Sequence, residues 1–149
     1  MEALVMKKRA MFALVALLLL GAVFGIYQLL SKPSLTDAEK AAIEFYSALE
    51  FDGDGKTANE LHIGDTDWTE FVTKKPKEVL KVSISPMIPS TDTRVQVLVY
   101  TTSDDTGCIL DMVKENGWKV NKYKNEKGLY SYMASTFSMR EADWKEVQP

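Results

Sequence analysis

The sequence predicts an α+β fold class, with a single N-terminal transmembrane helix ahead of the folded domain. Residues 10–31 form an uncharged run of 22 residues. A helix of that length measures about 33 Å, which is enough to cross a hydrocarbon core of ~30 Å. Helix signals follow, and after residue 77 apolar residues recur with the two-residue period of strands. Because helices precede consecutive strands, we expect N-terminal helices packed on a curved antiparallel sheet.

The charges that flank the apolar run predict its orientation. Lys7, Lys8 and Arg9 precede it, and Lys32 alone follows closely. This asymmetry places the N-terminus in the cytoplasm and the rest of the chain outside the cell membrane. The predicted parts are a cytoplasmic basic tail, a transmembrane signal anchor, a linker and an extracytoplasmic domain, over residues 1–9, 10–31, 32–35 and 36–149.

A cleaved signal peptide is the main alternative for this segment. Such a peptide has an apolar core of about 7–15 residues and a small-x-small cleavage site. The run here is longer, and its end from Gly25 to Leu30 lacks that site. A buried core helix is the second alternative, but the run has no polar face. A retained anchor is therefore favoured.

Charge and cysteine content limit the partners of the outer domain. Residues 33–149 carry 14 basic and 20 acidic residues, a net charge of −6. This balance argues against nucleic acid as a partner. Cys108 is the only cysteine, so no intramolecular disulfide can form. Its apolar surroundings predict a buried, inert thiol, with an intermolecular disulfide as the alternative.

Local signals predict the helices of the outer domain. Residues 36–39 form a capping box that begins a helix running to about Phe51. The glycines in Asp52-Gly53-Asp54-Gly55 stop this helix. A second capping box at residues 57–60 predicts a short helix, and another helical turn is expected around 67–73.

Alternating apolar residues predict four strands and leave the tail ambiguous. The strands are expected over residues 80–85, 94–100, 108–115 and 118–123. Asn116-Gly117 is a two-residue hairpin signal. A turn is also expected at 125–128. Beyond Leu129, aromatic residues suit a strand, whereas Met139–Val147 suits a helix.

The segment 36–124 resembles a known superfamily. A capped helix bearing Phe45-Tyr46 and Leu49 leads into a Gly-Asp-Gly turn and a short helix with Ala58 and Leu61. Antiparallel strands follow and include Glu115-Asn116-Gly117-Trp118-Lys119-Val120. This pattern resembles the cone-shaped nuclear-transport-factor-2-like superfamily, also called ketosteroid-isomerase-like. It is most similar to small bacterial envelope proteins that carry such a domain behind an N-terminal anchor. The superfamily includes enzymes, binders and assembly subunits, so the resemblance alone implies little about function.

A two-residue turn at Asn116-Gly117 predicts the register of the last hairpin. Val113 then faces Val120, and Asp111 faces Lys122. The same register opposes two lysines, which is unfavourable and favours a longer turn.

Asp111, Trp118 and Val120 are the candidate pocket residues. The register places them on one face, where the resembling fold often has a pocket, and an isomerase-like enzyme keeps an acid or base there. The favoured alternative is a cross-strand ion pair between Asp111 and Lys122.

Other motifs favour structural roles. Asp52-Gly53-Asp54 lacks the remaining ligands of an EF-hand loop and indicates a helix-stopping turn. A zinc site usually draws on several histidines and cysteines, whereas His62 is the only histidine here and Cys108 the only cysteine. We therefore expect His62 to be a partly exposed residue of a helix. We predict no catalytic residue, metal or cofactor. A C-terminal aromatic cluster suits either a partner surface or packing of the tail on the domain: Tyr123, Tyr130, Tyr132, Phe137 and Trp144.

These features predict a non-enzymatic, single-pass membrane protein of a bacterial cell envelope. Its outer domain is expected to bind another membrane or envelope protein or itself. One alternative is a pocket protein or isomerase-like enzyme for a small apolar ligand. Another is a subunit of a secretion or conjugation machine, because bitopic subunits of those machines resemble this arrangement. A structural or stress protein of the envelope is a further alternative.

Overall fold

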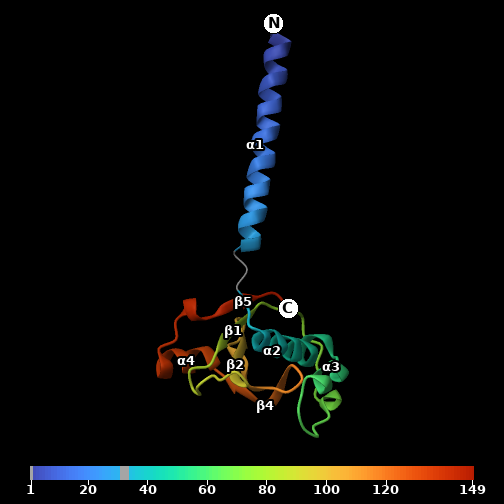
Figure 1. The fold of residues 1–149 in the computed structure, drawn as a ribbon, viewed down its shortest axis with the longest axis vertical. Helices are drawn as coiled ribbons and strands as arrows, with labels where there is room; N and C mark the ends of the chain where they lie inside the picture. Colours follow the sequence, from blue (N-terminus) through green and yellow to red (C-terminus); the bar gives the residue numbers. More distant parts are fainter. Residues whose placement is uncertain (1, 31–33) are drawn as a thin grey trace. The chain divides into compact units, whose positions relative to one another are not determined.

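The computed structural model describes residues 2–30 and 34–149 (Figure 1). The chain divides into two compact units, Met1–Ser34 and Leu35–Pro149. Residues 32 and 33 of the predicted linker 32–35 lie outside the described residues. The side chains of the predicted topology determinants Lys7, Lys8 and Arg9 lie outside the described part as well.

The first unit contains one helix, α1 (Glu2–Leu30). Its Ala- and Leu-rich sequence has high helix propensity. Large apolar side chains along it are 47% to 72% exposed. They are Met11, Phe12, Leu14, Val15, Leu17, Leu18, Leu19, Leu20, Val23 and Ile26. Within the described residues, no helix combines the length and the apolar composition needed to cross a membrane.

The second unit begins with the capped helix that the sequence predicts. The Thr36 hydroxyl accepts a hydrogen bond from the Glu39 backbone N–H, and the Glu39 carboxylate accepts one from the Thr36 N–H. Helix α2 (Asp37–Ser47) continues as the π-helical segment η1 (Ala48–Asp52). The segment ends at Gly53, which has a left-handed conformation. The expected helix and the helix-stopping turn are both confirmed.

The next helix begins earlier than predicted. Helix α3 spans Gly55–Glu60, and the Asp54 carboxylate caps it by accepting hydrogen bonds from the Thr57 N–H and hydroxyl. The predicted capping box at residues 57–60 is therefore wrong. Asp54 reaches the free N–H groups of the first turn from outside the helix, as an N-cap residue must. The helical turn expected around 67–73 is confirmed by the 3-10 segment η2 (Trp68–Glu70).

A five-stranded antiparallel sheet forms the body of the domain. Its strands are β1 (Leu80–Ile84), β2 (Arg94–Thr101), β3 (Thr106–Lys114), β4 (Trp118–Lys127) and β5 (Lys145–Val147). They lie in the order β4-β3-β2-β1-β5. The four predicted strands are confirmed, although β4 continues through the turn expected at 125–128.

The tail adopts the reverse of both expectations. Residues expected to suit a strand form α4 (Leu129–Phe137). The segment expected to suit a helix contains only the short η3 (Glu141–Asp143) and then β5. Leu129 and Met133, one helical turn apart, are fully buried, so packing against the sheet determines the tail structure.

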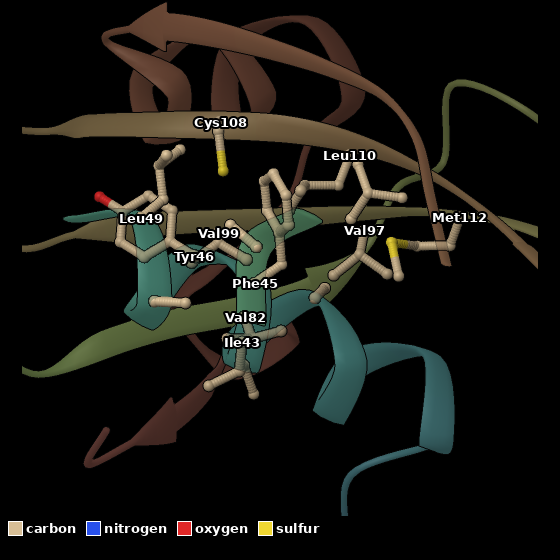
Figure 2. Close-up of a cluster of buried hydrophobic side chains, with 14 of the residues drawn as sticks. Ile43, Phe45, Tyr46, Leu49, Val82, Val97, Val99, Cys108, Leu110 and Met112 are labelled. Carbon is tan, nitrogen blue, oxygen red and sulfur yellow. The ribbon is translucent and has the colours of Figure 1, made fainter. Parts of the chain in front are cut away.

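Each face of the sheet packs on its own hydrophobic core. Helix α2 covers one face, with side chains such as Phe45 packed among Val97, Leu110 and Met112 (Figure 2). Cys108 is fully buried in this core, and burial raises the pKa of its thiol. Helix α4 and the tail cover the other face, at the opposite side of β2 in Figure 1. This second core contains Leu98, Tyr100, Leu129, Met133, Met139 and Trp144.

Candidate functional site

The β3–β4 hairpin has a longer turn than the sequence predicts. Lys114 pairs with Trp118, and Met112 pairs with Val120, so three residues form the connection. A bulge beside Met112 then restores the predicted pairing of Asp111 with Lys122. The pairing of Val113 with Val120 is wrong, because Val113 faces Lys119. The longer turn avoids two directly opposed lysines.

The structure does not bring the three predicted pocket residues together. Val120 is fully buried in the core beneath α2, and Trp118 packs partly against that core. Asp111 lies between Leu110 and Met112 in β3, which both point into that core, so it lies on the opposite face. The longer turn separates the two groups, because it pairs Met112 rather than Val113 with Val120 and so leaves Asp111 on the other face.

Asp111 is part of a polar network at the edge of the second core. Its carboxylate accepts a 2.8 Å hydrogen bond from the Gln96 amide and lies 3.5 Å from Arg94 Nη2. The side chain of Asp111 is only 13% exposed. Both oxygens are thus engaged by residues of the neighbouring strand β2, which is the arrangement of a structural cross-strand contact.

His62 lies outside the helix in which it was expected. It follows α3 and forms a parallel bridge with Val120 of β4. Its ring lies 5.1 Å from the Trp68 ring and 6.4 Å from the Phe45 ring. Burial lowers the pKa of His62 below its ordinary value, because the aromatic surroundings disfavour the charged imidazolium.

The C-terminal aromatic residues divide into buried and exposed groups. Trp144 is buried in the second core, where its ring lies 4.7 Å from the Tyr100 ring, and Tyr130 packs beside them. Tyr132 and Phe137 remain 44% and 36% exposed on α4. Packing of the tail accounts for the buried members, and only the exposed pair is left as a possible partner surface.

A cavity of about 350 Å³ lies where α2 and η1 meet the β3–β4 pair. Every lining residue has a polar or charged group: Tyr46, Glu50, Lys75, Thr106, Asn125, Glu126 and Lys127. Tyr46 and Glu50 are four residues apart and therefore lie on the same side of the helix. Thr106 and Lys127 are directly opposed in the β3–β4 pair.

Two ion pairs neutralise the carboxylates of this cavity. The Glu50 carboxylate lies 2.5 Å from Lys75 Nζ, and its side chain is only 13% exposed. Glu126 pairs with Lys124 at 2.8 Å. Among the described residues, Lys127 has no ion-pair partner, so one positive charge is left at the cavity.

Two tyrosines lie beside the cavity. Tyr46 is 5% exposed, and in Figure 2 its oxygen lies at the outer edge of the core cluster. Its hydroxyl makes no hydrogen bond to the described residues. The Tyr123 hydroxyl donates to the Asn125 carbonyl oxygen at 2.5 Å. Burial raises the pKa of both tyrosines above the ordinary range, with a smaller contribution from the Glu50 charge, so both hydroxyls stay protonated at neutral pH.

Sequence reasoning did not find this cavity. Its residues come from segments as far apart as Tyr46 and Lys127, and none forms a recognised motif. The one local signal is the spacing of Tyr46 and Glu50 on a predicted helix, where a carboxylate sits beside an aromatic core position.

Comparison of the chain with protein-family models, with curated proteins and with solved structures gives no match. The fold is therefore described by its own geometry: an α+β domain whose N-terminal helices pack on a five-stranded antiparallel sheet.

Proposed function

We propose that this protein is a single-pass membrane protein whose outer domain binds another envelope protein or a second copy of itself. The observation that carries the proposal is the uncovered apolar surface of α1. Its ten large apolar side chains between Met11 and Ile26 are exposed around the whole helix. A helix that is apolar on all sides requires an apolar environment, and the uncharged run 10–31 is long enough for a bilayer.

We also propose that the outer domain is nuclear-transport-factor-2-like. The support is the order of elements: a capped helix, a short second helix and then consecutive antiparallel strands that pack against the first helix. Glu115-Asn116-Gly117, the first half of the motif from Glu115 to Val120 on which the resemblance rests, forms the connection between the last two long strands. The superfamily includes binders and assembly subunits as well as enzymes, so a partner-binding role is compatible with this fold.

The exposed aromatic pair on α4 is the candidate contact surface. The Tyr132 and Phe137 rings lie 6.1 Å apart and stay exposed while their neighbours Leu129 and Met133 are buried. Exposed aromatic residues are enriched at the centres of protein interfaces. The proposed partner is an envelope component, because the membrane anchor restricts the domain to that surface.

Reporter fusions test the topology. Alkaline phosphatase fused after Pro149 is expected to be active, and a cytoplasmic reporter at the same position inactive. The arrangement is tested further by changing Lys7, Lys8 and Arg9 to glutamine, which removes the charge bias and is expected to lower phosphatase activity. An inactive phosphatase fusion beside an active cytoplasmic reporter refutes the proposed orientation.

Site-specific photo-crosslinking in membranes tests partner binding. A photoreactive amino acid at Tyr132 or Phe137 is expected to give a discrete crosslinked product. The same group at exposed Lys122 on β4 is the matched control and is expected to give less of this product. A product equal in yield at all three positions, or no product at Tyr132 and Phe137, counts against this surface as an interface.

A further inference from the structure

The cavity beside α2 contains a tyrosine hydroxyl that is available to a bound molecule. Tyr46 lines the cavity and is more than nine-tenths buried, with an exposed fraction of 5%. Its hydroxyl has no hydrogen-bond partner among the described residues. The hydroxyl oxygen itself is not fully buried, so a molecule in the cavity can reach it and form a hydrogen bond with it.

The charge of the cavity indicates the charge of its ligand. The Glu50 carboxylate is compensated by Lys75 and the Glu126 carboxylate by Lys124. Lys127 has no such partner among the described residues, so the lining favours one additional negative charge. The Glu50 and Glu126 carboxylates disfavour a second negative charge on the ligand, because like charges at close range repel.

The remaining donors fit a carboxylate. The Asn125 oxygen accepts from the Tyr123 hydroxyl, which fixes the amide and leaves its N–H₂ group free to donate. The lysine ammonium, the amide and the Tyr46 hydroxyl can each donate to a carboxylate oxygen. Between these polar groups, the lysine stems and the tyrosine ring offer apolar contact to the body of a small molecule.

We propose that this cavity binds a small organic monocarboxylate, with its carboxylate at Lys127, Asn125 and the Tyr46 hydroxyl. A volume of about 350 Å³ matches the lower end of small-molecule sites. This site is separate from the exposed pair on α4, and it does not depend on partner binding.

The test is an NMR titration of the full chain in phosphatidylcholine nanodiscs, a lipid without carboxylate headgroups. Sodium benzoate is expected to shift the backbone amide signals of Tyr46, Asn125 and Lys127. Benzamide has the same ring without the charge, and it is expected to bind at least tenfold more weakly because a charge-assisted hydrogen bond is lost. Inorganic phosphate is also expected to bind at least tenfold more weakly, because its second negative charge is repelled by Glu50 and Glu126. The weakest specific complexes have a Kd of about 10 millimolar. If benzoate at concentrations up to about 10 millimolar shifts none of these amide signals, the proposal is overturned.

Variants separate binding from folding. Lys127→Met keeps the stem, removes the charge and is expected to weaken benzoate binding about tenfold. Tyr46→Phe removes a hydroxyl with no protein partner, so the free protein is expected to keep its fold, with shift changes confined to the neighbours of residue 46, while benzoate binding falls about fivefold. Lys122→Met, on the same strand but outside the cavity, is the control. Equal affinity for benzamide or phosphate, or an equal loss in Lys122→Met and Lys127→Met, overturns the assignment.

Discussion

Glu39 is the single residue that joins the start of the domain to its last strand. Its side chain is fully buried, and its carboxylate accepts hydrogen bonds from Lys145 Nζ at 2.6 and 2.8 Å and from the Thr36 N–H at 2.7 Å. A buried carboxylate is tolerated only when its oxygens are satisfied in this way. One side chain thus serves both as the capping-box acid of α2 and as the anchor of β5.

Replacement of Lys145 tests this role. Removing one partner of a buried ion pair costs about 3 kcal/mol. Because the Lys145 side chain is 32% exposed, we expect Lys145→Met to lower the free energy of unfolding by about 2 kcal/mol. Urea unfolding followed by tryptophan fluorescence measures the change, with Lys122→Met as the exposed control. Adding Glu39→Gln is expected to recover part of the loss, and equal losses in the two lysine variants would contradict the prediction.

His62 makes stability depend on pH. Its pKa in the folded domain lies below the ordinary 6.5, because burial disfavours the imidazolium. As pH falls below 6.5, the unfolded chain takes up the proton first, so the folded state loses stability. His62 is the only histidine, so we expect the urea midpoint to fall between pH 7 and 5.5 and His62→Gln to flatten this slope. A midpoint that rises on acidification would contradict the sign.

At the scale of elements, local signals predict α2 and β1 to β4, whereas tertiary packing decides the tail. The capping box at Thr36 and the alternation in β2 depend on neighbouring residues only. The segment after Leu129 has both strand-forming aromatics and a helical spacing of buried residues. Burial of Leu129 and Met133 against the second face of the sheet selects the helix. The bulge in β4 likewise depends on pairing across strands, which no single-strand pattern reveals.

The pairing of β2 with β3 requires a residue without a side chain at Gly107. A Cβ there would lie 2.5 Å from the Val99 carbonyl oxygen and 2.7 Å from the Tyr100 Cβ. We therefore expect Gly107→Ala to lower the free energy of unfolding by about 2 kcal/mol, as overpacked sites do. Gly117→Ala is the comparison, because its Cβ meets no atom within 4 Å and only its positive φ opposes the change. Its loss should be about 1 kcal/mol, and a larger loss at Gly117 would refute the steric argument.

At the scale of the molecule, the sequence predicts the class of the fold better than its candidate site. The two-part organisation depends on composition along the chain, which can be read directly. The cavity depends on how α2 meets the β3–β4 pair, and it brings together Tyr46 and Lys127 from distant segments. Asp111, predicted from the alternation of one hairpin, lies on the other face because the turn is one residue longer than expected, which changes the register. A one-residue shift is invisible in the sequence pattern and reverses the face of a side chain.

The division of the chain predicts that the second unit folds by itself. Among the described residues, both hydrophobic cores consist of residues between Leu35 and Val147, and the Glu39–Lys145 pair lies within the same unit. A domain that contains its whole core has what it needs for cooperative folding. We therefore expect a fragment of residues 34–149 to unfold in a single urea transition, with a midpoint equal to that of the full chain in detergent.

The Lys145→Met change provides the control for the fragment. If the fragment has the native fold, the change should lower its free energy of unfolding by the same ~2 kcal/mol expected in the full chain. A fragment that unfolds without a cooperative transition, or that is insensitive to Lys145→Met, would mean that α1 contributes to the fold of the domain. In that case α1 would act as a structural element in addition to its proposed role as a membrane anchor.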